Sequence, residues 1–247
     1  MNSGANPAVR VFADPESLFR GAAEFVASLA QGAASRGRFS VALSGGSTPV
    51  RLYALLASPP YRDRIDWARL HLFWADERCV PWDHRDSNYR LVYDMLLTKV
   101  SIPRGNVHRI VGEEEPECAA QEYDYDVRSF FEPSFPAFDL VLLGAGEDGH
   151  TASLFPGAAA LRERTRLAVA VFFEPPRISR ISLTLQALNH AREVIFLASG
   201  RAKAAVVHEI LEDGNPKQYP AGLVRPADGR VTWMLDRDAA GLLMERR

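Results

Sequence analysis

An imidazole and two carboxylates are crowded into one glycine-rich stretch of this sequence, LLGAGEDGHTASLFPG, which covers residues 142–157. His150 carries the side chain whose ordinary pKa, about 6.5, suits proton transfer near neutral pH. Asp148 lies two residues earlier, where its carboxylate can accept a hydrogen bond from one ring nitrogen or hold the loop in place. The stretch therefore predicts an acid–base site in which His150 moves the proton. A structural histidine bonded to a backbone carbonyl is the alternative.

The same stretch also has the glycine spacing of a dinucleotide-binding turn, because Gly144, Gly146 and Gly149 spell G-x-G-x-x-G behind an apolar run. Such a turn needs a continuous helix after the last glycine, so that the helix N-terminus faces the pyrophosphate. Here a Pro-Gly pair at 156–157 interrupts the chain, and the acidic residues of the turn would repel an anion. Glu174 follows the next apolar run, where a dinucleotide-binding protein has an acidic residue that contacts the ribose. We favour the acid–base interpretation.

A second glycine turn, SGGSTP at residues 44–49, follows the apolar run FSVAL. Gly45 and Gly46 let the backbone approach a ligand closely, and free N–H groups of the turn, which continues through Ser47 and Thr48, can cradle a phosphate. We expect Thr48 to cap a helix that begins at Pro49. The alternative is a glycine turn that only starts a helix.

Charged residues follow two other apolar runs. Asp76 and Arg78 arrive together in ADER, after LHLFW, and an arginine there suits a bidentate contact to a phosphate. A local ion pair that only organises the loop is the alternative. Lys203 lies in SGRAKA, where it can bring a point charge to a phosphate beside a helix N-terminus. Asp83, His84 and Asp86 have polar neighbours, so we interpret 83–86 as a solvated loop and not as a metal site.

Short apolar runs alternate with amphipathic segments along the chain, which is the pattern of an α/β protein. Because the runs are continuous, we expect strands buried on both faces, in a mostly parallel sheet flanked by helices on both faces. The first helix is expected to have Asp14 as its N-cap, Pro15 at its first position and a stop at Gly37. The predicted strands cover 39–43, 70–74, 138–143, 167–173, 193–199 and 231–235, and further helices cover 87–100, 116–131 and 200–213.

Composition narrows the class of protein. The chain has 247 residues, 47% of them hydrophobic and 24% charged, and we interpret it as a single domain over 1–247 with a short flexible N-terminus at about residues 1–8. A net charge of −2 provides no basic field for nucleic acid. The longest apolar run, 167–173, is too short to span a membrane. Two cysteines and no signal-peptide pattern predict a cytoplasmic protein, and the sequence, compatible with a monomer, leaves the oligomeric state open.

Taken together, the three loops and SGRAKA resemble, in this order and spacing, the motifs of the 6-phosphogluconolactonase family. The tail PAGLVRP…VTWMLDRDAA is similar to that family's C-terminal end, so the likeness runs from about residue 10 to 243. The resemblance implies a fold similar to that of glucosamine-6-phosphate deaminases and ribose-5-phosphate isomerases, without an organic cofactor. It also implies hydrolysis of a phosphorylated sugar lactone, 6-phosphoglucono-δ-lactone, to 6-phosphogluconate in the oxidative pentose phosphate pathway.

Carried over by motif, His150 becomes the base that activates water. The phosphate end of the substrate would be held by the glycine turn at 44–49, by Arg78 and by Lys203. Asp148 and Asp76 match acidic positions of the wider superfamily, in which the deaminases use carboxylates for proton transfer. The resemblance implies no metal ligand. We expect backbone N–H groups of a glycine loop to stabilise the oxyanion that forms on C1.

Two rival functions share the fold. A glucosamine-6-phosphate deaminase typically has a glutamate shortly after the histidine, in a context like FNEP, whereas this chain has SLFPG at 153–157 and no acid there. The second deaminase motif resembles D-E-Y, and here Arg78 takes the third place. A non-catalytic sugar-phosphate sensor is the other rival, but no helix-turn-helix module accompanies this domain. The two departures from the deaminase motifs favour the lactonase.

Overall fold

Two sheets organise the chain in the computed structural model, which describes residues 6–33, 37–212 and 218–243. The strands are β1 (Ala8–Phe12), β2 (Phe39–Leu43), β3 (Leu70–Trp74), β4 (Asp76–Arg78), β5 (Val107–His108), β6 (Leu140–Leu143), β7 (Ala168–Val171), β8 (Arg180–Leu183), β9 (Glu193–Ala198) and β10 (Arg230–Asp236). The larger sheet has the order β1-β10-β9-β6-β2-β3-β5, and its neighbouring strands all run parallel. The smaller sheet, β4-β8-β7, is antiparallel.

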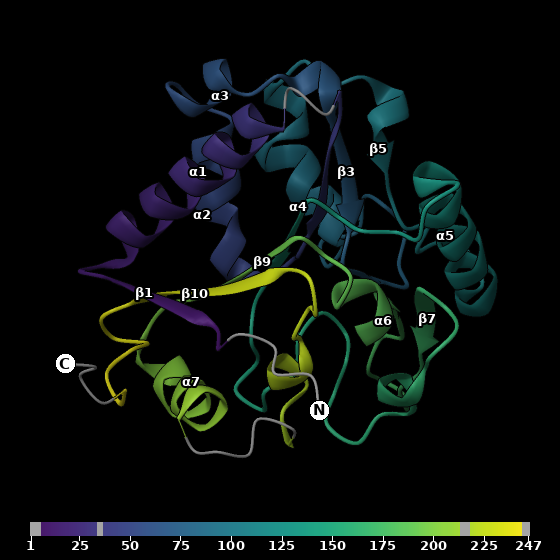
Figure 1. The fold of residues 1–247 in the computed structure, drawn as a ribbon. Coiled ribbons are helices and arrows are strands. Elements are labelled where there is room, and N and C mark those ends of the chain that lie inside the picture. The colour runs from purple at the N-terminus through teal and green to yellow at the C-terminus, as the bar shows by residue number, and fades with distance from the viewer. Residues whose placement is uncertain (1–5, 34–36, 213–217, 244–247) are drawn as a thin grey trace.

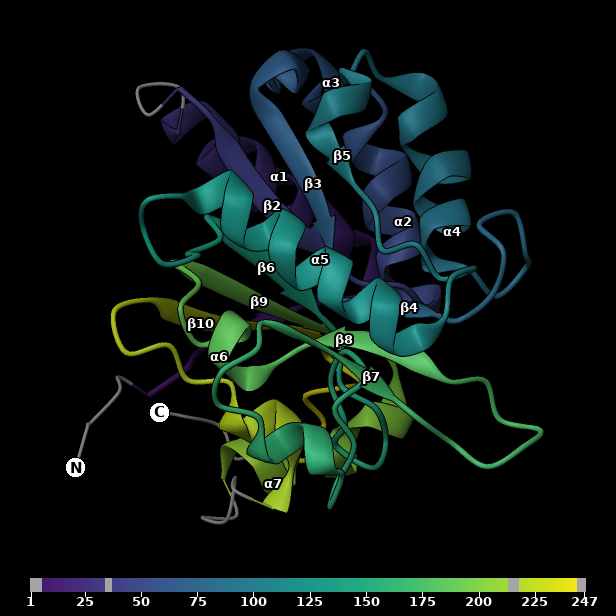
Figure 2. The same ribbon diagram turned by 90° about the vertical axis from the view of Figure 1, so that its right-hand side faces the viewer.

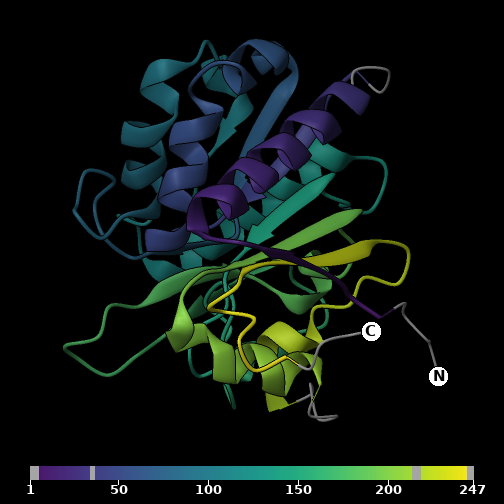
Figure 3. The same ribbon diagram turned by 90° about the vertical axis from the view of Figure 1, so that its left-hand side faces the viewer.

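Helices cover both faces of the parallel sheet. They are α1 (Pro15–Gly32), α2 (Ser47–Leu56), α3 (Tyr61–Arg64), α4 (Asn88–Met95), α5 (Pro116–Phe131), α6 (Leu185–Leu188) and α7 (Ala204–Leu211). Helices α1 and α2 pack against each other on one face, where they lie side by side at the left in Figure 1, and Figure 3 shows α1 in front of the strands. Helix α5 crosses the opposite face and contacts β7 and β8 of the small sheet (Figure 2). The prediction of a mostly parallel sheet flanked by helices is confirmed.

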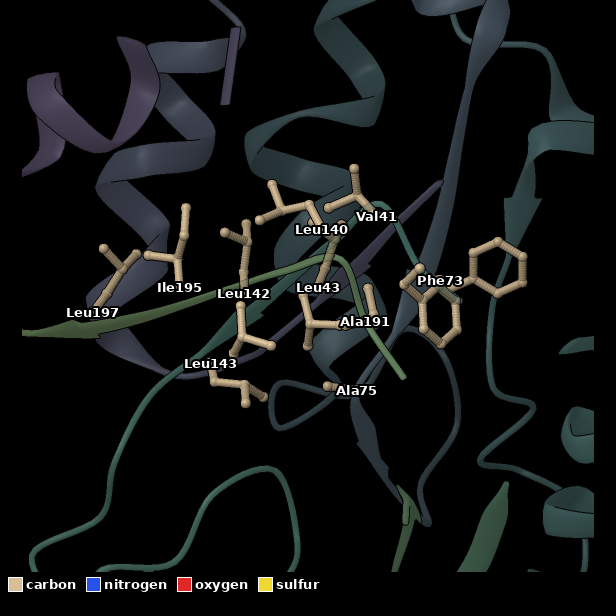
Figure 4. Packing of buried hydrophobic residues seen from close by; sticks show 14 of the residues in the cluster. Val41, Leu43, Phe73, Ala75, Leu140, Leu142, Leu143, Ala191, Ile195 and Leu197 are labelled. Atoms are coloured by element: carbon tan, nitrogen blue, oxygen red, sulfur yellow. The ribbon is translucent and has the colours of Figure 1, made fainter. Parts of the chain in front are cut away.

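The core lies between these layers, where the central strands are buried along their whole length. Every residue of β2, β6 and β9 is buried. Leu43, Leu142 and Ile195 come from these three strands and pack together at the centre of the sheet (Figure 4). Full burial of such a side chain contributes about 1.5–3 kcal/mol, so the continuous apolar runs are what hold the sheet between its helices.

The small antiparallel sheet was not predicted from the sequence. The run 167–173 was expected to join the parallel sheet, and that expectation is wrong: β7 pairs with β8 and so belongs to the small sheet. The strand also ends at Val171, and Phe172 is exposed in the connection to β8, which extends away from the body of the molecule (Figure 2, Figure 3). An apolar run specifies burial but not which partner the strand takes.

The first strand and the end of the first helix also differ from the predictions. Residues 1–5 of the segment expected to be flexible lie outside the described residues, but Ala8 already pairs with Thr232 at the start of β1. Helix α1 begins as expected, because the Asp14 carboxylate accepts a hydrogen bond from the Ser17 N–H and the Ser17 side chain accepts one in return. It ends at Gly32, however, before the expected stop at Gly37.

The topology places a crevice at the centre of the parallel sheet. From β2 the chain passes to β3 on one side, and β6 later joins β2 on the other side. In open parallel sheets, ligands bind beyond the carboxyl ends of the strands at such a reversal of strand order. No helix in the described part of the chain has both the length and the apolar character needed to cross a membrane.

Candidate active site

Loops that follow β2, β3, β6 and β9 meet around a cavity of about 230 Å³. Because these strands are parallel, their carboxyl ends reach the same edge of the sheet. All but one of the residues predicted for the site line this cavity, and the exception, Asp148, contacts a lining residue directly. The predicted lining residues are Gly45, Gly46, Ser47, Thr48, Asp76, Arg78, His150 and Lys203.

The imidazole of His150 is held on two sides and remains open to the cavity. Its Nδ1 lies 2.5 Å from Oδ1 of Asp148, and its ring stacks on Phe155 with the ring centres 4.4 Å apart. The side chain is 30% exposed, so the histidine is neither sealed into the core nor free in solution. Partial burial raises the pKa of Asp148, but hydrogen bonds from the His150 ring and backbone outweigh it, and the net pKa is lowered. This contact occupies Nδ1 of His150, so Nε2 is the ring nitrogen left for a ligand in the cavity.

The loop that carries this pair is tightly folded around Gly146. The Gly146 N–H donates to the backbone oxygen of His150 at 2.8 Å, and the Gly149 N–H donates to that of Gly146 at 3.0 Å. A Cβ atom at Gly146 would lie 2.1 Å from Nδ1 of His150 and 2.6 Å from Oδ1 of Asp148. Any larger residue would therefore push the imidazole or its carboxylate away. This glycine is needed because the imidazole lies against its backbone.

The dinucleotide interpretation fails on local structure. Residues 144–158, all of which the structure describes, contain no helix, and Thr151 instead forms a short bridge with Leu154. No helix N-terminus is therefore available to face a pyrophosphate after Gly149. The turn presents Asp148 and His150 instead.

The loop after β3 places Asp76 at the base of the cavity, where it is 5% exposed. Its Oδ2 accepts a 2.6 Å hydrogen bond from Oγ of Ser153 and lies 3.9 Å from Nη1 of Arg180. Asn88 donates to Oδ1 of Asp76 at 3.2 Å. The carboxylate is thus bound on several sides, which explains how strand β4 is fixed beside the His150 loop.

The adjacent Glu77 is an anchor and not a site residue. Its carboxylate accepts backbone hydrogen bonds from Asn88 and Tyr89 at the start of α4 and from Arg78, each of 2.7 Å. Burial raises the pKa of Glu77 although these hydrogen bonds oppose the rise. Ser87 caps the same helix through the Arg90 N–H, as expected for a serine at that place.

Arg78 lines the cavity from β4 and is held there by its own loop. One terminal nitrogen donates to the backbone oxygen of Asp86, while the Nε atom is buried without a partner in the described part of the chain. The alternative interpretation, a local ion pair that only organises the loop, is not seen for Asp76 and Arg78 among the described residues, and Asp76 contacts Arg180 across the small sheet instead. The described contacts thus leave the Nε–H of Arg78 unused beside the cavity.

The glycine turn starts a helix two residues earlier than expected. Helix α2 begins at Ser47 and not at Pro49, and Thr48 therefore lies inside its first turn and does not cap it. Gly46 is the N-cap with φ of 91°, a conformation that residues with a Cβ rarely adopt, and no side chain caps the helix. The first N–H groups of α2 are thus turned to the cavity wall without a side-chain acceptor, which suits an anion.

Lys203 reaches the cavity from a turn fixed by Asp236, the last residue of β10. The Asp236 carboxylate, 1% exposed, accepts hydrogen bonds from Oγ of Ser199 at 2.5 Å and from the Gly200 N–H at 3.0 Å. Lys203 ends the 3₁₀ helix that follows and directly precedes α7. The predicted cation beside a helix start is therefore present, although α7 itself begins only at Ala204.

The sequence left out or left open several cavity residues. Arg180 and Asn88 were not among the predicted site residues, yet both line the cavity, as does Ser44 at the start of the predicted glycine turn. Ser153, which binds Asp76, was also missed. Arg180 enters the site because β8 pairs with β4, and no local pattern in the sequence predicts that pairing. In the sequence, the only signal for Asn88 was its own polar side chain at the start of a predicted helix.

Comparisons with known proteins assign the chain to a family. The family model for glucosamine-6-phosphate isomerases/6-phosphogluconolactonase matches residues 13–233, and the chain belongs to this family. Among curated relatives, 6-phosphogluconolactonase from Homo sapiens is 42% identical over 240 residues, covering 95% of this chain and 93% of the relative. The corresponding protein of Synechocystis is 42% identical over 211 residues, covering 83% and 85%.

Solved structures of the same family have the same fold. The 6-phosphogluconolactonase of Trypanosoma brucei superposes with a TM-score of 0.86 at 31% identity, covering 97% of this chain and 99% of that one. A monomeric glucosamine-6-phosphate deaminase also superposes, with a TM-score of 0.82 but 21% identity, and therefore shows the shared fold alone. It covers 95% of this chain and 99% of its own. The fold is thus that of the superfamily anticipated from the motifs.

Proposed function

We propose that this protein hydrolyses 6-phosphoglucono-δ-lactone to 6-phosphogluconate. The observation that carries the proposal is the pairing of His150 with Asp148 at a cavity that also holds Arg78 and Lys203. An oriented imidazole can take a proton from water, and the cations can hold a phosphorylated substrate at its non-reacting end. The lactonase relatives at 42% identity support the same reaction.

The phosphate group is proposed to bind the start of α2, with Lys203 and Arg78 as its cationic partners. The uncapped N–H groups after Gly46 and the positive end of the helix dipole favour a dianion at that place. Fixing the remote phosphate orients the lactone carbonyl toward His150, so that binding energy from a group that does not react positions the group that does.

The proton transfers run through Nε2 of His150. Neutral His150 removes a proton from a water molecule as the water oxygen bonds to C1 of the lactone. The bond between C1 and the ring oxygen then breaks, and the imidazolium gives its proton to that oxygen. Asp148 keeps its contact to Nδ1 throughout and stabilises the positive charge of the intermediate imidazolium. Asp76 is proposed to organise the site through Ser153 and Arg180.

Phe155 favours hydrolysis over the deaminase reaction. When the proline of the deaminase motif is matched to Pro156, Phe155 stands where that motif has its glutamate. Here an apolar ring stacks on His150 and supplies no second proton-transfer group. A site with one base on the reacting side suits water attack on a lactone, whereas ring opening of an amino sugar needs further proton transfers.

The proposed place of this reaction is the oxidative pentose phosphate pathway in the cytoplasm. The hydrolysis would follow a step that oxidises a phosphorylated aldose to its lactone. Cys79 and Cys118 are both free thiols, which agrees with a reducing compartment.

A direct assay tests the proposal. The phosphorylated lactone is generated enzymatically, and its disappearance is followed against the spontaneous background, with unphosphorylated gluconolactone and glucosamine 6-phosphate measured in parallel. We expect fast hydrolysis of the phosphorylated lactone and poor use of the unphosphorylated one. Arg78→Ala and Lys203→Ala should each raise KM for the phosphorylated lactone by about tenfold or more, the loss expected for one charge-assisted hydrogen bond.

Two other results would contradict the proposal. Ammonia release from glucosamine 6-phosphate would identify a deaminase, and binding of sugar phosphates without turnover would identify a sensor. Equal efficiency toward both lactones would refute the phosphate anchor while leaving the hydrolysis itself intact.

A further inference from the structure

The guanidinium of Arg180 has an ion-pair contact to Asp76 but no hydrogen-bond acceptor among the described residues. Arg180 begins β8, lines the cavity and has a side chain that is only 21% exposed. The side chain makes no hydrogen bond to a described residue, its Nε is buried without a partner, and the Asp76 carboxylate lies 3.9 Å away. An arginine has five N–H donors, and burying one of them without an acceptor is costly.

A second positive charge makes this arrangement more costly. Arg180 lies directly opposite Arg78 in the antiparallel pair of β4 and β8, where like charges destabilise a sheet. Burial lowers the pKa of Arg180; Asp76 opposes this, whereas the charges of Arg78 and Arg177 add to it. Two neighbouring arginines with buried, unpaired Nε atoms are therefore suited to meeting negative charge that arrives with the substrate.

Arg180 lies near His150, at the end of the cavity where the reaction is proposed to take place. Phe155 stacks on His150 at 4.4 Å, and the same ring lies 5.7 Å from the Cζ atom of Arg180. The guanidinium and the imidazole thus approach one aromatic ring and face one cavity. Lys203 and the start of α2 reach that cavity from other strands and are assigned to the phosphate.

The glycine loop itself has few donors left for an oxyanion. Its N–H groups at Gly146, Gly149 and His150 donate to the backbone oxygen of His150, the backbone oxygen of Gly146 and the carboxylate of Asp148, respectively. Backbone N–H groups of a glycine loop were expected to stabilise the oxyanion, and these three N–H groups are already engaged within the loop. Arg180, whose Nε is buried without a partner, is a further donor near His150.

We propose that Arg180 is a catalytic residue of the lactonase reaction, which donates hydrogen bonds to the carbonyl oxygen on C1 as that oxygen becomes negatively charged. This inference rests on the proposed function. When the water oxygen bonds to C1, the carbonyl electron pair moves onto the oxygen and faces the guanidinium. The pair returns as the bond from C1 to the ring oxygen breaks, and the proton held by His150 goes to the ring oxygen. Arg180 keeps all its protons and acts through its charge and its hydrogen bonds to the oxyanion.

The test separates chemistry from binding. Arg180→Gln should lower kcat for the phosphorylated lactone by about 10²–10³-fold, the loss typical of one oxyanion donor, with KM within about threefold of the wild-type value. Arg180→Lys, which keeps the charge, should retain more of kcat than Arg180→Gln. Free guanidinium ion, at concentrations too low to unfold the protein, should partly restore kcat of Arg180→Ala.

Arg177 provides a matched control. Its guanidinium lies over Phe155 at 4.4 Å and over Phe173 at 3.6 Å, but Arg177 does not line the cavity. Arg177→Gln should stay within about threefold of wild type in kcat and KM. Binding of inorganic phosphate, measured by calorimetry, should be weakened by Lys203→Gln and unchanged by Arg180→Gln.

Several results would overturn the inference. A raised KM with intact kcat, together with weakened binding of inorganic phosphate by Arg180→Gln, would make Arg180 part of the phosphate anchor. An equal loss of kcat in Arg177→Gln would indicate a general disturbance of the segment between β7 and β8. A wild-type protein without lactone turnover would refute the proposed function and this inference with it, whereas an active wild type with an unimpaired Arg180→Gln variant would refute the inference alone.

Discussion

Two imidazole–carboxylate pairs lie in different parts of this protein. His150 and Asp148 meet in the loop after β6, and His108 and Asp126 meet where β5 packs beside α5, with 3.0 Å between Nδ1 and the nearer carboxylate oxygen. In both pairs Nδ1 faces the carboxylate, so the hydrogen bond alone does not distinguish them. The difference lies in what the second ring nitrogen faces.

The second nitrogen of His108 faces another side chain. Its Nε2 lies 3.2 Å from Nδ1 of His71, and its ring stacks on Phe73 with the ring centres 4.2 Å apart. The side chain of His108 is 13% exposed, against 30% for His150, whose loop lines the cavity. Of these two pairs, the His150 pair is the one at the cavity that Arg78 and Lys203 also line, and for this reason the proposed acid–base role is assigned to it.

The largest expected effect removes one imidazole of each pair. His150→Gln should lower kcat by about 10²–10⁴-fold with little change in KM, because general acid–base help is lost while the phosphate anchor remains. His108→Gln should keep near-normal kcat and lose about 1–3 kcal/mol of stability, because a partly buried charged hydrogen bond is disturbed. Steady-state kinetics and urea unfolding of both variants provide the comparison. Near-normal turnover in His150→Gln would end the assignment of His150.

A smaller effect is expected from moving the imidazole without removing it. Gly146→Ala places a methyl group where Nδ1 of His150 now lies, 2.1 Å from the new Cβ, so the ring must shift. Displacement of a catalytic group by about 1 Å can cost about 10²-fold in rate, and we expect a loss of that order in kcat. Gly32→Ala, whose Cβ would meet open space at the end of α1, is the control and should not change kcat. Unchanged kinetics in Gly146→Ala would show that the loop can shift to accommodate the methyl group without displacing the imidazole.

The smallest effect is a pH dependence of stability from the second pair. Burial, followed by the positive charges of His108 and Arg38, lowers the pKa of His71 to about 4. In the unfolded chain the pKa is about 6.5, so below that pH the unfolded state binds more protons, and stability falls as the pH drops toward 4. We expect a loss of about 1–2 kcal/mol once solvent screening at this partly exposed ring is taken into account.

Urea unfolding between pH 7 and pH 4 would measure this effect. His71→Leu should show a smaller loss over the same interval, because the group that takes up the proton is gone. An identical pH slope in wild type and His71→Leu would show that His71 does not contribute. Catalysis should not report on this titration, since His71 does not line the cavity.

The comparison also shows which parts of the molecule could be predicted from the sequence. The central strands were predictable because burial on both faces requires continuous apolar runs, and the end of each such strand in a parallel sheet marks the site. His150, Asp148, Arg78 and Lys203 were predicted in this way. Arg180 and Ser153 were not predicted, because the pairing of β4 with β8 and the contact to Asp76 join residues 77 to 106 positions apart in sequence without any local pattern.

Strand β1 was missed for a related reason. Its residues are all exposed or half-buried at the edge of the sheet, and it lacks the continuous apolar character of the central strands. The antiparallel assignment of β7 was missed because a short apolar run does not specify the direction of its partner. Helix starts were more predictable where a side chain caps the helix, as at Asp14, than where the glycine turn leaves α2 uncapped.

The pairing of β1 with β10 has a consequence for how the protein comes to be made. Strand β1 cannot pair until β10 has been made, since Ala8–Phe12 pairs with Thr232–Asp236. Asp236 is also the residue that fixes the turn leading to Lys203. Closing this edge of the sheet joins residues 224 positions apart in sequence, a long-range step of the kind that slows folding, and the same strand that completes the edge also holds the turn before Lys203.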